Sequence, residues 1–149
     1  MPSVFTRIID GELPGRFVWR DDRAVAFLSI NPISPGHTLV VPREEVDHWL
    51  DLDPELWQHV SEVARIVGTG IQRAFDPPRV GQAIEGFEVP HAHVHVLQIG
   101  KVGDLSPGRA ERDPDPAVLD DAARKIREAL HELGYAAQAG DPATGEPTG

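Results

Sequence analysis

Three histidines occupy every second position of one short apolar stretch, VPHAHVHVLQI, which covers residues 89–99. They are His91, His93 and His95, and only Ala92 and Val94 separate them. Successive side chains of a β-strand point to opposite faces, so a strand here would place all three imidazoles on one face, about 6.6 Å apart. Such a face could grip a tetrahedral oxyanion or bind a metal ion.

Three interpretations of this histidine face are open from the residues alone. The first is a polar strand face exposed to water, which suits a single histidine better than three in strict alternation. The second is a zinc site, but three successive alternating ligands are difficult to bring onto one ion, and Glu85 and Glu88 are the nearest acids. The third is nucleophilic catalysis on phosphorus, in which the central imidazole attacks and its neighbours hold the oxyanion and protonate the leaving group. A neutral imidazole can do this at pH 7 without a metal.

The bulk composition limits the classes of protein that can carry this site. A chain of 149 residues forms one domain, or one domain plus tails, and 40% hydrophobic content is normal for a globular protein. A net charge of -10 argues against binding to nucleic acid polymers or anionic membranes. The chain has no cysteine, no apolar run that would span a bilayer and no secretion signal at its start, so a cytoplasmic protein is expected.

The hydrophobic pattern predicts an α+β fold, an antiparallel sheet covered by helices. Asp53 is the predicted cap of a central amphipathic helix over 54–75, and a second helix over 116–133 ends before Gly134. The predicted strands are 16–22, 24–30, 37–42, 79–86 and 87–99. We expect residues 1–102 to form the main domain, 103–134 a linker and a helix packed on it, and 135–149 a disordered tail.

Three blocks of this sequence resemble the histidine triad (HIT) family. HAHVHVL, residues 91–97, matches the pattern His-φ-His-φ-His-φ-φ, in which φ is apolar, at every position. AVAFLSINPISPGHTLVVPREEVDHW, residues 24–49, is similar to the nucleoside-binding segment, and VFTRIIDGELPGRFVWRDD, residues 4–22, is similar to the family's opening. The order and spacing of the blocks also fit, over roughly residues 4–100.

The resemblance implies a HIT-like α+β fold, a homodimer, and attack of the middle histidine on the α-phosphorus of a nucleotide. By position His93 is the nucleophile, His91 and His37 orient the site, and His95 contacts the phosphate and the leaving group. The positions that match the family's base pocket are Phe5, Ile8, Phe27, Ile30 and Leu39. The segment that would run beside the phosphate consists of Gly86, Phe87, Glu88 and Val89.

Two positions depart from the family pattern. Ser29 stands where an acid or amide usually holds the ribose hydroxyls, and Phe87 follows Gly86 where glutamine is common. A serine can make one hydrogen bond there but cannot accept two hydroxyls as a carboxylate does. The ribose-binding asparagine has no clear match, and Gln82 is the nearest candidate.

The resulting hypothesis is a hydrolase or transferase that acts on a small nucleotide, with a nucleoside phosphoramidase favoured. A dinucleoside polyphosphate hydrolase is the alternative enzyme. A nucleotide-binding regulatory protein with weak activity is the alternative from another class, and a metal-binding protein ranks last. No metal or other cofactor is expected to be required. Trp57 and Ile66 are apolar positions away from the main stripe of the central helix, so we expect a homodimer that pairs through this helix.

Overall fold

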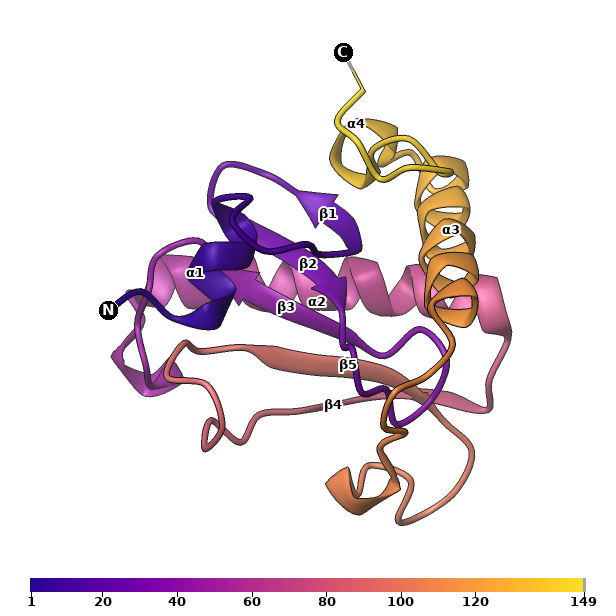
Figure 1. The fold of residues 1–149 in the computed structure, drawn as a ribbon, viewed down its shortest axis with the longest axis horizontal. Helices are drawn as coiled ribbons and strands as arrows, with labels where there is room; N and C mark the ends of the chain where they lie inside the picture. The colour runs from indigo at the N-terminus through magenta and orange to yellow at the C-terminus, as the bar shows by residue number, and fades with distance from the viewer. Residues whose placement is uncertain (149) are drawn as a thin grey trace.

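Five strands form one antiparallel sheet in the computed structural model, which describes residues 1–148 (Figure 1). Their order across the sheet is β1-β2-β3-β5-β4. The α+β fold with an antiparallel sheet, expected from the sequence, is confirmed. The strands are β1 (Phe17–Arg20), β2 (Ala24–Leu28), β3 (Thr38–Pro42), β4 (Arg79–Ala83) and β5 (Val94–Ile99).

Helix α2 (Pro54–Phe75) covers one face of the sheet and lies behind it in Figure 1. It begins as predicted, because the side chain of Asp53 accepts a hydrogen bond from the backbone N–H of Glu55. Its predicted apolar stripe is buried against the sheet, at Leu56, Val60, Val63, Val67 and Ile71. Within residues 1–148, no helix combines the length and apolar character needed to span a membrane.

The opposite face of the sheet carries α1 (Val4–Ile9), a short helix that the sequence did not predict. Alternation along β2 sorts the side chains between the two faces: Ala24, Ala26 and Leu28 join the core under α2. Val25 and Phe27 point the other way and pack with Phe5 of α1 in a second buried cluster, here called the aromatic cluster. Its buried members are Phe5, Phe17, Val25, Phe27, Leu39 and Val41.

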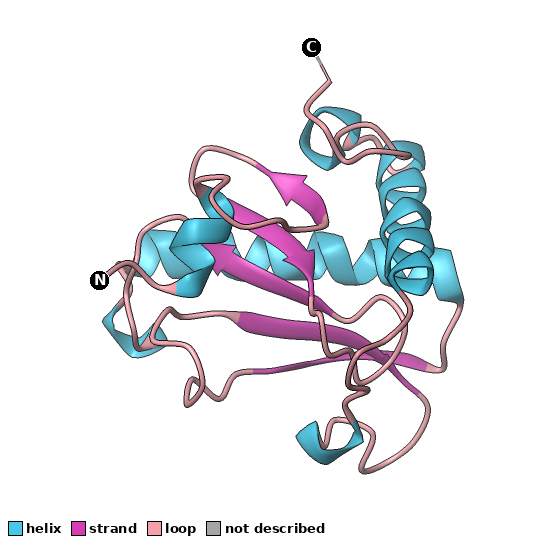
Figure 2. Ribbon diagram, in the orientation of Figure 1, coloured by secondary structure: helices cyan, strands magenta, loops and turns pink. Residues whose placement is uncertain are grey.

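The C-terminal part of the chain packs as helices at the β1 edge of the sheet (Figure 2). They are α3 (Pro116–Glu132), which also packs on α2, and α4 (Ala136–Ala139). Two 3₁₀ turns complete the described structure, η1 (Trp49–Asp51) and η2 (Pro107–Arg109).

Residues 135–148 differ from the disordered tail that their composition predicted. Arg127 of α3 is 4% exposed, and its guanidinium donates hydrogen bonds to the carbonyls of Phe17 (2.7 Å) and Pro142 (3.2 Å). Arg20 of β1 donates to the carbonyl of Gly145 at 2.5 Å. Two arginines thus bind the last segment to the sheet edge through backbone carbonyls, which composition alone does not reveal.

Candidate active site

The histidines gather on the face of the sheet that carries the aromatic cluster. His95 of β5 pairs in register with Leu39 of β3, a member of that cluster, and Val94 and Val96 belong to the core under α2. The predicted alternation is therefore confirmed within β5. The strand begins only at Val94, so His91 and His93 lie in the irregular segment that precedes it. In that segment regular strand spacing does not apply, and the rings of His93 and His95 are 5.0 Å apart.

The hydrogen bonds of His93 fix which nitrogen is free to react. Its Nδ1 lies 2.7 Å from the carbonyl oxygen of His91. A carbonyl only accepts hydrogen bonds, so Nδ1 carries the proton and Nε2 keeps its lone pair. Burial lowers the pKa of His93 below its ordinary value, which favours the neutral imidazole. The ring of Phe5 meets the His93 ring edge-on at 4.9 Å and fixes its orientation.

His91 has both ring nitrogens engaged inside the protein and is fully buried. Its Nε2 donates to the carbonyl of Pro42 (2.7 Å), so Nδ1 accepts a hydrogen bond from the hydroxyl of Ser3 (2.7 Å). Burial also lowers the pKa of His91. The carbonyl of His91 therefore orients the ring of His93, whereas the ring of His91 has no free nitrogen to offer a ligand.

A network at the start of α1 supports His91. Glu45 accepts hydrogen bonds from the backbone N–H of Ser3 (2.6 Å) and from the hydroxyl of Thr6 (2.7 Å). Ser3 also caps α1 by accepting from the backbone N–H of Thr6. The same serine thus begins the helix and holds His91 in place.

His37 and His95 form a directed pair. The backbone N–H of Ile33 donates to Nδ1 of His37 (3.0 Å), so the proton of His37 lies on Nε2 and points to Nδ1 of His95 at 2.9 Å. The proton of His95 is then on Nε2. Burial, reinforced in each case by a neighbouring histidine, lowers the pKa of both rings to about 4. The resting pair is neutral and offers a hydrogen-bond donor at His95 Nε2.

Gly36 places His37 at the start of β3. Its φ is +86°, a conformation that favours glycine, and an added Cβ would lie 2.6 Å from the ring of Phe75. Ile126 of α3 also approaches this glycine, at 3.3 Å from the Cβ position. The loop that carries His37 is therefore packed against the end of α2 and against α3.

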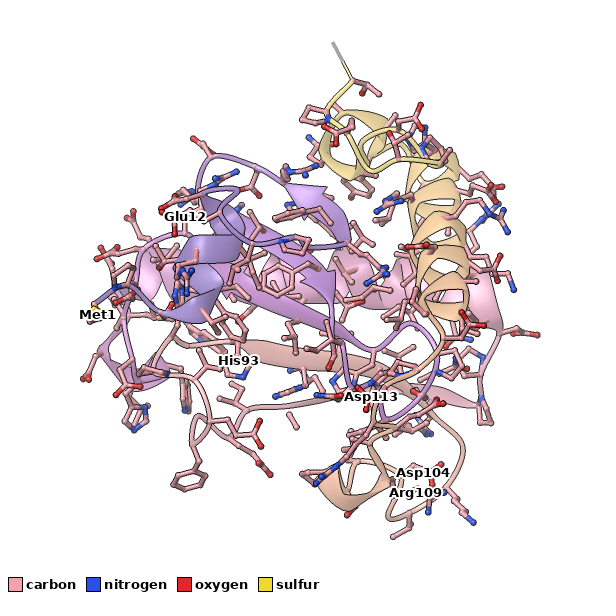
Figure 3. All side chains as sticks on the ribbon, in the orientation of Figure 1. Met1, Glu12, His93, Asp104, Arg109 and Asp113 are labelled. Carbon is pink, nitrogen blue, oxygen red and sulfur yellow. The ribbon has the colours of Figure 1, made fainter. Side chains whose placement is uncertain are left out.

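A cavity of about 500 Å³ opens over His37, His93 and His95. This volume falls within the range of small-molecule sites. One wall comes from residues 29–33, a second from residues 83–88, and a third from the loop after β5, at residues 105–113. Figure 3 shows His93 beside the sheet and Asp113 in the returning loop.

The structure brings most of the predicted binding residues to this region. Ser29, Gly86, Phe87 and Glu88 line the cavity with the histidines. Phe5, Phe27 and Leu39 are buried in the aromatic cluster next to His93, and Ile8 and Val89 pack against that cluster.

Two predicted residues lie elsewhere. Gln82 pairs with Val96 in the β4–β5 register, whereas its neighbour Ala83 pairs with His95. Gln82 therefore faces the α2 side of the sheet, and Ala83 lines the cavity instead. Ile30 is 69% exposed and belongs neither to the cavity nor to the aromatic cluster, because it lies past the end of β2.

Comparison with known proteins decides the family. The model of the HIT domain matches residues 10–101, more than half of the chain. The chain belongs to the histidine triad family. HIT proteins are generally nucleotide hydrolases or transferases.

The most similar HIT relatives include proteins without a characterised activity. An uncharacterized HIT-like protein of Mycobacterium tuberculosis is 33% identical over 150 residues, which cover 93% of this chain and 99% of the relative. Another, from Methanocaldococcus jannaschii, is 35% identical over 98 residues, 63% of this chain and 76% of the relative. A hypothetical histidine triad nucleotide-binding protein from Sulfolobus tokodaii has a solved structure with 26% identity and a TM-score of 0.76, covering 87% of this chain and 92% of its own.

One solved relative, a zinc-bound histidine triad family protein from Mycobacterium smegmatis, raises the question of a metal. It is 27% identical with a TM-score of 0.76, and the match covers 89% of this chain and 96% of the relative. Residues 1–148 contain no group of three His, Asp or Glu side chains arranged to hold a metal ion. The hydrogen bonds explain why: both nitrogens of His91 and of His37 are engaged within the protein. The four HIT histidines as arranged here do not fit a three-histidine metal site.

Two parts of the HIT site were not predicted from the sequence. The first is the network of Ser3, Thr6 and Glu45, which becomes visible only when α1 is placed beside His91. The second is the loop at 105–113, whose proline, glycine and charged residues predicted no more than a linker. Its position follows from the chain path, because the loop leaves β5 at Ile99, only four residues after His95.

Proposed function

We propose that this protein is a nucleotide hydrolase in which His93 attacks the α-phosphorus and forms a covalent nucleotidyl-histidine, with nucleoside phosphoramidates as the favoured substrates. The observation that carries this proposal is the hydrogen bond from Nδ1 of His93 to the carbonyl of His91. It leaves the Nε2 lone pair free beside a cavity that also holds His95. A free nucleophile of this kind argues against a purely regulatory binding protein.

In the first step, Nε2 of His93 forms a bond to the α-phosphorus as the bond from phosphorus to the leaving nitrogen breaks. The phosphate anion bound beside His95 raises the pKa of that imidazole, because an opposite charge favours the protonated form. Protonated His95 has a proton on each ring nitrogen, so His37 must take its other tautomer and accept a hydrogen bond from Nδ1 of His95 instead of donating to it. Nε2 of His95 gives its proton to the leaving nitrogen, which departs as an amine with the bonding electron pair. His95 is then neutral, and His93 carries the nucleotidyl group.

In the second step, a water molecule attacks the same phosphorus from the side that the amine has left. Neutral His95 takes the proton from this water, and the bond from His93 to phosphorus breaks. Both histidines thereby return to the states in which the cycle began. Nδ1–H of His93 stays hydrogen-bonded to the carbonyl of His91 in both steps. This carbonyl therefore stabilises the positive charge that develops on the His93 ring.

The leaving group is best identified with a substrate panel ranked by kcat/KM. The panel contains AMP and GMP phosphoramidates and the dinucleoside polyphosphates of the same bases. We expect the phosphoramidates to rank first. A higher kcat/KM for dinucleoside polyphosphates would replace the favoured activity with the alternative, and binding without turnover of any substrate would favour a regulatory protein.

Ser29 is proposed to face the ribose, and its substitution tests this placement. Ser29 lines the cavity and accepts a hydrogen bond from the backbone N–H of Asn31 (3.2 Å). We expect Ser29→Asp to tighten binding of AMP or GMP by about one to two decades, because a charged hydrogen bond contributes about 1.5–3 kcal/mol. The gain should be larger for the ribonucleotide than for its 2′-deoxy form, as measured by calorimetric titration. Ser29→Asn separates the effect of charge from that of shape, and no gain for either sugar would show that Ser29 does not face the ribose.

We also propose a homodimer, as is typical of HIT proteins, but through different residues from those that suggested it. Ile66 is buried in the chain's own core, and Trp57 packs on Trp49 with ring centroids 4.9 Å apart. The support comes instead from β4, an edge strand that is partly exposed and borders a groove against α2. An unpaired edge strand can continue its sheet into a second copy.

Sedimentation equilibrium at micromolar concentration tests the dimer. We expect a species of twice the 16.3 kDa chain mass. Thr69→Arg, which places a charge in the groove between α2 and β4, should shift the equilibrium toward monomer. A monomeric wild-type protein would contradict the proposal.

A further inference from the structure

The loop between β5 and α3 forms the outer wall of the catalytic cavity and is tied down at two points. Asp104 accepts hydrogen bonds from the backbone N–H groups of Gly100 (2.8 Å) and Lys101 (3.0 Å). The backbone N–H of Glu111 donates to the carbonyl of Pro32 at 2.8 Å. This second bond fixes the neighbouring Arg112 beside residues 31–33, the stretch whose Ile33 amide orients His37.

Arg112 is the only Lys or Arg among the described residues that line this cavity. It is exposed, and among residues 1–148 no carboxylate lies within ion-pair distance of it. Since the resting histidines are neutral, Arg112 supplies the cavity's permanent positive charge. A guanidinium of this kind matches the geometry of a carboxylate or phosphate, which it can bind through two parallel hydrogen bonds.

Three carboxylates share the outer part of the cavity with this arginine. Glu85 and Glu88 come from the loop before the triad, and Asp113 follows Arg112 directly. A leaving group with several negative charges, such as a polyphosphate, would bring those charges among the carboxylates. A leaving group with one anionic end needs only the single guanidinium. The three carboxylates and the single guanidinium in this part of the cavity therefore favour a leaving group with one negative charge over one with several.

We propose that Arg112 determines leaving-group specificity by binding a single carboxylate on the departing amine. This rests on the proposed function, and it adds one requirement to it: the departing amine carries a free carboxylate at its far end. The bonds that change are those given above: the leaving nitrogen takes the electron pair of its bond to phosphorus and a proton from His95. Arg112 contacts only the far end of the leaving group.

Two substrates that differ in one charge test this directly. They are the adenosine 5′-phosphoramidates of glycine and of glycinamide, which are nearly identical in shape. We expect wild-type kcat/KM to favour the glycine compound by about ten- to a hundredfold, the range that corresponds to a charged hydrogen-bonded pair. Arg112→Ala should abolish this preference by lowering kcat/KM much more for the glycine compound than for the glycinamide compound, and Arg112→Lys should keep part of the preference.

Arg109→Ala is the matched control, because it removes the same charge from the same loop. Arg109 lies 3.8 Å from Asp104 and does not line the catalytic cavity, and Figure 3 shows these two side chains together in the loop. The control should keep the wild-type preference. Three results would overturn the proposal: no wild-type preference for glycine, an equal loss on both substrates in Arg112→Ala, or the same loss of preference in Arg109→Ala.

Binding measured without turnover separates this proposal from the proposed function. Calorimetric titration of both compounds into a His93→Ala background should give the same preference in Kd, with its loss on adding Arg112→Ala. If wild-type protein hydrolyses neither compound but the preference in Kd holds, the proposed function fails and the role of Arg112 stands. If both compounds are hydrolysed and Kd shows no preference, the role of Arg112 fails alone.

Discussion

Replacing His93 with alanine is expected to reduce kcat by roughly a thousandfold or more while leaving nucleotide affinity nearly unchanged. In the proposed mechanism the imidazole forms the covalent bond to phosphorus, whereas we expect the cavity walls to supply most of the binding. Steady-state kinetics on a phosphoramidate and calorimetric titration with the nucleotide product measure the two effects separately.

The alanine variant also removes a hydrogen bond to the His91 carbonyl, so a second variant is needed. In His93→Asn, the side-chain amide can still donate to that carbonyl but has no nucleophilic nitrogen. Both variants should be inactive and both should bind nucleotide. Turnover at the wild-type rate in either one would contradict the assignment of His93 as the nucleophile.

The free energy of unfolding should fall as the pH is lowered from about 7 to 4, in part because of His37. Burial, together with His95, lowers its pKa in the folded protein to about 4, against about 6.5 in the unfolded chain. Between these values the unfolded chain binds a proton that the folded protein does not, so stability is complete above about pH 6.5 and is lost toward pH 4. The contribution of His37 over this range is on the order of 2–3 kcal/mol.

Chemical denaturation at pH 7 and pH 4.5 measures this loss. His37→Asn removes the titrating ring, and its stability should therefore depend on pH less steeply than that of the wild type, by about 2 kcal/mol over this interval. His48→Asn is the control, because His48 is exposed and does not line the cavity. Equal pH dependence in wild type and His37→Asn would show that His37 is not held neutral by the fold.

The sequence predicted the parts of the fold that rest on long periodic patterns and on local rules. The apolar stripe from Leu56 to Ile71 and the cap at Asp53 gave α2, and the strands were placed near their observed positions. The spacing of the histidines predicted the triad, and the resemblance of the Pro-Gly-His block to the HIT family added His37, which the structure joins to His95 by a 2.9 Å hydrogen bond. In these cases the information lies within a few neighbouring residues.

The features that were missed depend on contacts between distant parts of the chain. Helix α1 is six residues long, too short for a reliable period, and its first cap residue, Ser3, bonds to His91, 88 positions away. Arg127 connects the last segment to β1 by donating hydrogen bonds to the carbonyls of Phe17 and Pro142. Every residue has a backbone carbonyl, so the sequence does not indicate which carbonyls an arginine will bind.

Gln82 was misplaced by a single position in strand register. Its neighbour Ala83 opposes His95, so the glutamine falls on the other face of the sheet. The position of Arg112 at the cavity could not be predicted for a related reason, because a charged residue in a proline-rich loop gives no indication of which cavity the loop reaches.

The central claim, a covalent nucleotidyl-His93, is tested most directly by the configuration at phosphorus after hydrolysis. A substrate with a chiral α-phosphorothioate is hydrolysed in ¹⁸O-labelled water, and the configuration of the product is then determined. Two successive in-line displacements, first by Nε2 of His93 and then by water, predict overall retention of configuration. Inversion would mean that water attacks the phosphorus directly, and it would contradict the account.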